Sequence, residues 1–158
     1  MNEEPSPYIY NKITSVRGRV TSSIISKKER DKLVARAEEV LGNECYGWKA
    51  SIDGFCLQLF SNSQHLYEFW LENWFSMPRE TRSHGRLYAV LDPEFNNGEP
   101  YAYYNPETKT AIIFNTEYYG QCKSWALGIT CDIAEDQHDI HSIHGSCVEV
   151  NWDGRGLI

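Results

Sequence analysis

Three histidines near the end of the chain are the residues whose type and spacing first suggest chemistry. His138, His141 and His144 follow one another at intervals of three, and histidine is both a common metal ligand and a common general acid or base. We expect them on a strand, where side chains alternate between two faces, so that His138 and His144 oppose His141. Three ligands arranged in this way do not converge easily on one metal ion. The pattern therefore favours the interpretation that these histidines are polar residues on a strand that enters the core. A metal site that uses His138 and His144 is the weaker alternative.

Other familiar catalytic patterns are absent from the sequence. It contains neither Gly-x-Ser-x-Gly nor a complete phosphate loop of the form G-x-x-x-x-G-K-[ST], and no spacing of carboxylates singles out a catalytic pair. The five cysteines are odd in number and include no Cys-x-x-Cys pair, which predicts reduced thiols rather than a disulfide framework or a zinc site. Lys123 could stabilise a phosphoryl group, although an exposed helix lysine is an equally good interpretation.

The composition is that of a soluble globular protein, with 41% hydrophobic and 23% charged residues in 158. The formal charge of -7 argues against a nucleic-acid partner, because phosphate-backbone binding needs a basic face. No apolar run approaches the roughly 20 residues of a membrane span, and the acidic start Met1–Pro5 does not resemble a secretory signal. We therefore expect a cytoplasmic protein with neither a membrane nor a nucleic acid as partner.

Three helices are predicted from capping signals and apolar spacing. Ser26 and Glu29 form a capping box before a helix over residues 27–41, which Gly42 ends. Ser61 to Gln64 suggests a second capping box, and the helix that follows carries a core stripe with Trp70 and Trp74 before it ends at Pro78. A third helix is predicted over roughly 117–135.

Strands are expected between these helices. Asp53-Gly54 predicts a hairpin within residues 46–60. A further strand is expected over 87–91, and residues 101–104 and 111–114 are expected to form a hairpin across Asn105–Thr108. A last hairpin turns at Asp153-Gly154 into an apolar strand in which the chain ends. Together these elements predict an α+β domain over residues 26–158, with a mixed, largely antiparallel sheet. Residues 1–25 are expected to be a flexible or irregular segment.

The C-terminal residues carry a resemblance to a known family. The motif is His144-Gly145-x-x-Val148-Glu149-Val150, followed by Gly154-x-Gly156-Leu157-Ile158. It resembles the strand pair that precedes the phosphate loop in HPr kinase/phosphorylase and related kinases, and the likeness extends over about residues 110–158. The resemblance implies the N-terminal portion of an ATP-dependent phosphotransferase, with the last hairpin leading into a truncated kinase core and the phosphate loop lying beyond Ile158.

The resemblance also implies roles and partners. His144 would act near the γ-phosphate and metal, and Lys123 would assist phosphoryl transfer. ATP and Mg²⁺ would serve the full-length protein, with neither site complete in this chain, and the phosphoacceptor would be a protein serine or a small molecule. We therefore expect the isolated chain to be inactive. A homo-oligomer is compatible with this resemblance.

Phosphoenolpyruvate carboxykinase belongs to the same superfamily. The segment from Tyr118 to Lys123 is similar to its Tyr-x-Gly-x-x-Lys-Lys segment, and Ser142-Ile143-His144 to its Ser-Met-His. Ser124 stands where that enzyme has its second, metal-binding lysine, which argues against carboxykinase activity. A carboxykinase-like fragment and a non-catalytic binding or interaction domain are the two alternatives to the kinase hypothesis.

Overall fold

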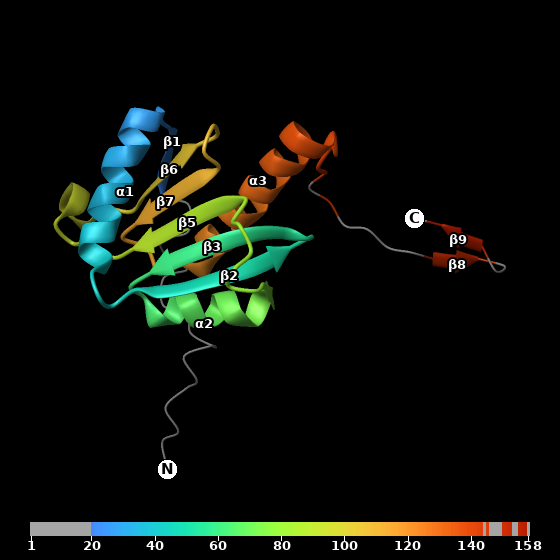
Figure 1. Cartoon of the computed structure of the whole chain (residues 1–158), viewed down its shortest axis with the longest axis horizontal. Helices are drawn as coiled ribbons and strands as arrows, with labels where there is room; N and C mark the ends of the chain where they lie inside the picture. Colours follow the sequence, from blue (N-terminus) through green and yellow to red (C-terminus); the bar gives the residue numbers. More distant parts are fainter. Residues whose placement is uncertain (1–19, 144, 146–149, 153–154, 158) are drawn as a thin grey trace, which may run out of the picture.

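The computed structural model describes residues 20–143, 145, 150–152 and 155–157. Its main body is a seven-stranded mixed sheet with three helices (Figure 1), which confirms the predicted α+β class. The helices are α1 (Lys27–Leu41), α2 (Gln64–Asn73) and α3 (Tyr119–His138). The strands of this sheet are β1 (Thr21–Ile24), β2 (Tyr46–Ile52), β3 (Phe55–Ser61), β4 (Phe75–Ser76), β5 (Gly85–Val90), β6 (Tyr101–Asn105) and β7 (Thr110–Phe114).

The centre of the sheet is parallel, which the sequence did not indicate. The strand order is β1-β6-β7-β5-β3-β2-β4, and β5 pairs in parallel with both β3 and β7. The edge strand β1 pairs in parallel with β6, whereas β2–β3, β2–β4 and β6–β7 are antiparallel. All five residues of β7 are buried, as expected of a central strand covered on both faces. The carboxyl ends of β3, β5 and β7 therefore lie at one edge of the sheet.

Local signals predicted the first helix and the first hairpin correctly. In α1 the Ser26 side chain accepts from the backbone N–H of Glu29, and the Glu29 carboxylate accepts from the backbone N–H of Ser26. Between β2 and β3, Asp53 and Gly54 have φ angles of 49° and 83°. A two-residue turn of this kind needs positive φ at both positions, and Asp-Gly tolerates it.

The start and end of α2 differ from the prediction. The N-cap is Ser63, whose Oγ accepts from the backbone N–H of Leu66. Ser61 is instead buried at the end of β3, where its Oγ donates to the Ala89 carbonyl oxygen. The helix ends at Asn73, before Pro78, because β4 follows and pairs with β2. Trp70 is fully buried, as the predicted core stripe requires.

The expected strand around the histidines is also corrected. His138 is the last residue of α3, and the helix ends at Asp139, which has a left-handed φ of 56°. The N–H groups of Asp139 and Ile140 both donate to the Ala134 carbonyl oxygen. His141 is exposed beyond this cap, and His144 lies outside the described residues. The prediction missed the last turn of the helix because the residues there are polar and exposed, and they leave no apolar period to follow.

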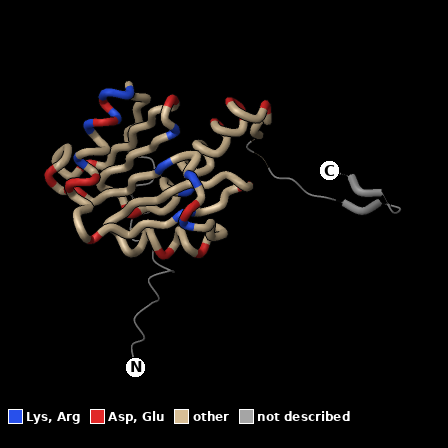
Figure 2. The backbone as a smooth tube through the Cα atoms, in the orientation of Figure 1, with Lys and Arg blue, Asp and Glu red and all other residues tan. Residues whose placement is uncertain are grey.

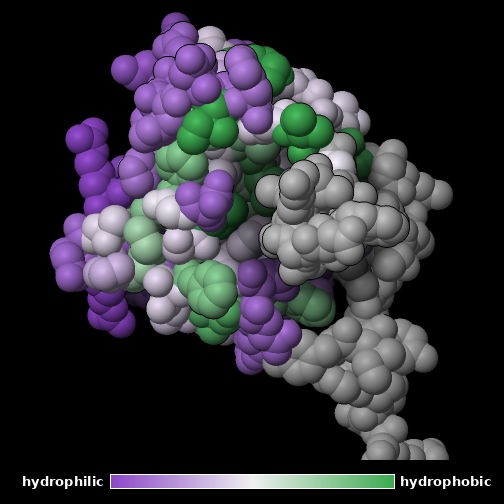
Figure 3. Space-filling model, turned by 90° about the vertical axis from the view of Figure 1, so that its right-hand side faces the viewer, coloured by the Kyte–Doolittle hydropathy of each residue, from purple (hydrophilic) through white to green (hydrophobic). Residues whose placement is uncertain are grey.

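Two hydrophobic cores cover the two faces of the sheet. The larger core joins α2 and α3 to inward residues that include Leu57, Leu87 and Ile113. The smaller core joins α1 to Tyr88, Val90, Ile112 and Phe114. Successive residues of β5 and β7 thus enter different cores. Outside the cores, hydrophobic residues lie between hydrophilic ones on the side shown in Figure 3.

The two ends of the described chain form an edge strand of the main sheet and a separate hairpin. Thr21–Ile24, within the segment expected to be irregular, forms the edge strand β1. The last described residues form the predicted hairpin, in which β8 (Val150–Trp152) and β9 (Arg155–Leu157) pair antiparallel as a sheet of their own. No helix in the described ranges is long and apolar enough to cross a membrane.

Gly85 offers a test of how tightly α3 packs against the sheet. A Cβ at this position would lie 2.5 Å from Ile129 Cγ2, 2.9 Å from Leu57 Cδ2 and 3.0 Å from the Lys109 carbonyl oxygen. We expect Gly85→Ala to lower the free energy of unfolding by about 1–3 kcal/mol through overpacking. Gly128→Ala is the matched control, because a Cβ there meets nothing within 4 Å and alanine favours a helix by about 1 kcal/mol. Urea unfolding of both variants measures the difference, and equal stabilities would contradict this packing.

Candidate functional site

An open cleft of about 700 Å³ lies on the face of the sheet that carries α1. Helix α1 packs on β5, β6 and β7. The cleft opens beside this helix, over residues of β2, β3 and β5 that point to the same face of the sheet. The segment before β5 closes the other side. The lining residues are Arg30, Glu38, Lys49, Gln58, Phe60, Arg82, Ser83, His84, Gly85, Arg86, Tyr88, Thr108 and Thr110.

The lining is strongly cationic in a chain whose net charge is negative. Among the described residues that line the cleft, three arginines and one lysine stand against the single carboxylate of Glu38. Figure 2 shows Lys and Arg positions at the start of α1 and on the strands of the sheet. Such a local excess of one sign attracts ligands of the other sign.

The arginines of the cleft are poorly neutralised by the protein. No described residue forms an ion pair or a side-chain hydrogen bond with the guanidinium group of Arg82 or Arg86. Arg30 pairs with Asp31 at 3.1 Å through Nη2, but its Nε is buried and has no partner among the described residues. These guanidinium groups therefore retain donors for a ligand.

Hydrogen bonds anchor the segment that carries Arg82. Lys49 Nζ donates to the carbonyl oxygens of Arg79 and Thr81, at 2.5 and 2.6 Å. The His84 N–H donates to the Cys56 carbonyl oxygen at 2.8 Å, and the Cys56 N–H donates to His84 Nδ1 at 2.9 Å. Because Nδ1 accepts, the proton of the neutral ring lies on Nε2. Strands β2 and β3 thus hold Arg82 and His84 at the rim of the cleft.

Tyr88 and Glu38 form the one acidic corner of the cleft. The Tyr88 hydroxyl donates to Glu38 Oε1 at 3.0 Å. Burial and, to a smaller extent, Glu38 raise the pKa of Tyr88 to about 12, although Arg86 and Arg30 oppose the shift. The phenol therefore keeps its proton at neutral pH and remains a donor to Glu38.

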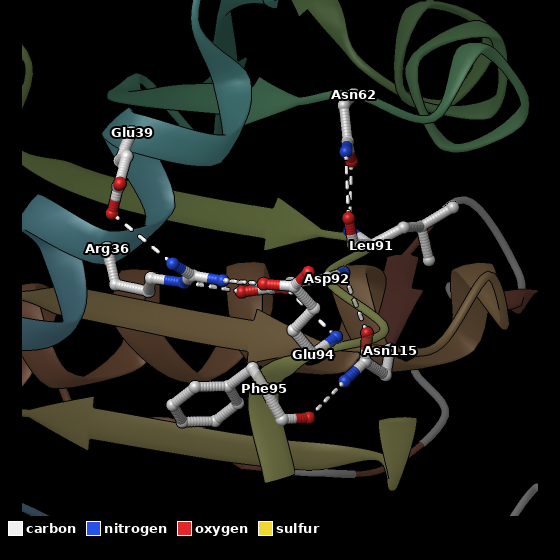
Figure 4. Close-up of polar contacts among 8 residues, drawn as sticks. All are labelled: Arg36, Glu39, Asn62, Leu91, Asp92, Glu94, Phe95 and Asn115. Carbon is white, nitrogen blue, oxygen red and sulfur yellow. Dashed lines mark hydrogen bonds and ion pairs between the residues drawn. The ribbon is translucent and has the colours of Figure 1, made fainter. Parts of the chain in front are cut away.

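A second polar cluster lies where the parallel strands β3, β5 and β7 end (Figure 4). Arg36 donates to both carboxylate oxygens of Asp92, at 2.7 and 3.1 Å. Asn115 Oδ1 accepts from the Asp92 N–H at 2.8 Å, while Asn62 exchanges two hydrogen bonds with the backbone of Leu91. These side chains bond to one another and to the backbone, so the cluster fastens α1 and the strand ends together. We regard it as structural.

The predicted site residues do not come together in the described structure. Lys123 is exposed on α3, which packs on the opposite face of the sheet from the cleft. His144 lies outside the described residues. His138 packs against the Phe55 ring, with centroids 5.2 Å apart. The described part of the chain holds no group of three or more His, Cys, Asp or Glu residues that could bind a metal.

Sequence reasoning did not find the cleft. Its cations come from α1, β2, β5 and the segment before β5, and each is unremarkable on its own strand or helix. The one local signal was Arg82-Ser83-His84-Gly85-Arg86, a short basic run directly before the apolar residues of β5. The four described cysteines, Cys45, Cys56, Cys122 and Cys131, are free thiols and do not line the cleft.

Comparison with known proteins gives no family for this chain. No protein-family model matches it, and no curated protein does.

The clamp in Figure 4 predicts a pH-dependent stability. The hydrogen bond from Arg36 lowers the pKa of Asp92, although burial opposes the shift. A carboxyl group with a lowered folded pKa adds stability above its unfolded pKa, about 3.9, and this stability is lost as the pH falls through the folded pKa. We expect Asp92→Asn to destabilise the protein clearly at pH 6 and much less at pH 2–3, as measured by urea unfolding.

The matched control is Glu39→Gln, since Glu39 also pairs with Arg36, at 3.3 Å, but its side chain is 72% exposed. A solvent-exposed pair contributes little, so its effect should be small at every pH. An Asp92→Asn deficit that stays constant from pH 6 to pH 2 would contradict the assigned ion pair.

Proposed function

We propose that this domain binds a phosphate-bearing ligand in the cationic cleft, as the acceptor-binding part of an HPr-kinase-like phosphotransferase. The observation that carries the proposal is the pair of guanidinium groups on Arg82 and Arg86, which no described residue neutralises. Guanidinium groups donate two parallel hydrogen bonds to phosphate oxygens and are more weakly hydrated than ammonium groups. A cleft of about 700 Å³ has the size of a small-molecule site.

Like charges in the cleft give a physical reason for an anionic ligand. Arg30 and Arg86 both act electrostatically on the Tyr88 hydroxyl, so their charges lie within reach of one point. Mutual repulsion of such charges costs folding free energy that an oxyanion would offset on binding. By contrast, Arg36 is already neutralised by Asp92, so its charge does not favour the binding of an anion.

The phosphotransferase part of the proposal draws on the C-terminal resemblance. The β8–β9 hairpin pairs Val150 with Leu157 and Trp152 with Arg155, which is compatible with the strand pair that the resemblance implies. In this proposal His144 acts near the transferred phosphoryl group and Mg²⁺, ATP is the phosphoryl donor, and the acceptor is a protein serine or a small molecule. Lys123 lies on the opposite face of the sheet from the cleft, so this proposal assigns it no role at the acceptor.

A non-catalytic binding domain is the second candidate. It is favoured by the fold of residues 20–143, in which both faces of the sheet have their own hydrophobic core. Both candidates use the cationic cleft, and they differ in whether phosphoryl transfer takes place.

Binding of inorganic phosphate and phenyl phosphate tests the cleft directly. We expect Arg82→Gln and Arg86→Gln each to weaken binding about ten- to a hundredfold, because each removes a charge-assisted hydrogen bond of about 1.5–3 kcal/mol. Isothermal titration calorimetry at low salt gives the affinities, which should fall as the ionic strength rises. The control is Arg79→Gln, since only the backbone of Arg79 takes part in anchoring the segment. Equal losses in all three variants would refute binding at this cleft.

The phosphoryl-transfer step is tested separately. Because the 158 residues contain no complete phosphate loop, we expect the isolated chain not to hydrolyse Mg-ATP. The proposal further predicts that the reading frame beyond Ile158 encodes a glycine-rich loop that ends in Gly-Lys-Ser or Gly-Lys-Thr. A reading frame without this loop would overturn the kinase assignment and leave phosphate binding intact. ATP hydrolysis by the isolated chain that His144→Ala abolishes would contradict the expected inactivity.

A further inference from the structure

We infer that the ligand of the cleft has two unlike ends, a phosphate group for the arginines and a hydrogen-bond donor for Glu38. The inference rests on the proposed phosphate binding and narrows its substrate class to phosphate esters that carry a hydroxyl or an ammonium group. A simple anion site needs no carboxylate, yet the Glu38 carboxylate lines this cleft.

The protein orients the Glu38 carboxylate through a hydrogen bond to only one of its two oxygens. Its Oε1 accepts from Tyr88, whereas no described residue bonds to its Oε2 and no described cation pairs with it. Tyr88 itself is 2% exposed and stacks on Phe60, with ring centroids 4.9 Å apart. A rigid buried ring thus fixes an exposed carboxylate at the cleft and leaves one of its oxygens free to accept.

The Tyr88 hydroxyl stays a hydrogen-bond donor to Glu38 at neutral pH. The raised pKa of Tyr88, about 12 and caused first by burial, keeps the phenol protonated and donating to Glu38. A carboxylate accepts hydrogen bonds and donates none when ionised. A ligand group beside Glu38 must therefore be a donor, and a second anion there would be repelled.

The backbone positions that carry Arg86, Arg30 and Glu38 are spread along the cleft. Arg86 and Tyr88 lie two residues apart on the same face of β5, which places their Cα atoms roughly 7 Å apart. Arg30 and Glu38 lie eight residues apart on α1, which corresponds to roughly 12 Å along the helix axis. A phosphate ester with a short polar chain can therefore place its phosphate on an arginine and its polar end on Glu38.

Three probes of graded chemistry test this inference. Methyl phosphate has no donor on its alkyl end, glycerol 3-phosphate adds hydroxyl groups, and phosphoethanolamine adds an ammonium group. We expect at least one of the latter two to bind the wild-type chain about tenfold more tightly than methyl phosphate does. The preferred one of the two distinguishes a hydroxyl end from an ammonium end. Titration calorimetry at one fixed ionic strength provides the three affinities.

The variant Glu38→Ala should remove this preference. We expect it to bind methyl phosphate as tightly as the wild type or more tightly, because a negative charge is lost, while the advantage of the donor-bearing probe falls to twofold or less. Tyr88→Phe, which keeps the ring, should reduce the advantage in part, because Glu38 loses its fixed orientation. Glu39→Ala is the control on the same helix and should leave all three affinities unchanged.

The outcomes separate the inference from the proposed function. Equal binding of all three probes to the wild-type chain would overturn the inference and leave phosphate binding standing. The same holds if Glu38→Ala weakens all three probes alike. If none of the probes binds the wild-type chain, the cleft is not a phosphate site and both proposals fail.

Discussion

The burial of β5 on both faces is the constraint on which the rest of this structure depends. β5 pairs in parallel with β3 on one side and with β7 on the other. Leu87 enters the core under α2 and α3, and Tyr88 enters the core under α1. Because strand side chains alternate, a slip of one residue would exchange these two sets and place Arg86 and Tyr88 in the wrong layer. The close approach of Ile129 and Leu57 to Gly85 fixes the start of the strand.

The candidate site follows from where α1 stops covering the sheet. On β5, Val90 and Tyr88 belong to the core under α1, whereas Arg86 lies outside it and is exposed. The Tyr88 ring is buried in that core, and its hydroxyl group reaches Glu38. The position of α1 thus determines where the cleft lies. Most of the charges in the cleft come from residues that lie on the same side of the sheet and that α1 does not cover. This arrangement explains why the cationic groups belong to four different segments.

Two arginine environments in one domain show what separates a structural ion pair from a candidate binding group. Arg36 has the buried Asp92 at 2.7 Å, and that pair also fixes the loop after β5 (Figure 4). Arg86 has no described carboxylate within ion-pair distance and faces an open cleft. A neutralised guanidinium group has little left to offer a ligand, whereas an unpaired one retains both its charge and its donors. The missing protein partner is therefore the most informative property of the cleft.

The elements that could be predicted from the sequence are those whose signals act within a few residues. The Ser26–Glu29 capping box, the Asp53-Gly54 turn and the β6–β7 hairpin all follow from contacts between near neighbours in the chain. The α+β class followed from the order of these elements. Three features became visible only in the tertiary structure: the parallel pairing of β5, the use of Ser63 rather than Ser61 as the α2 N-cap, and the assembly of the cleft. These features depend on contacts between residues far apart in the sequence, such as Ser61 with Ala89 and Tyr88 with Glu38, and no local pattern encodes which distant segments will meet.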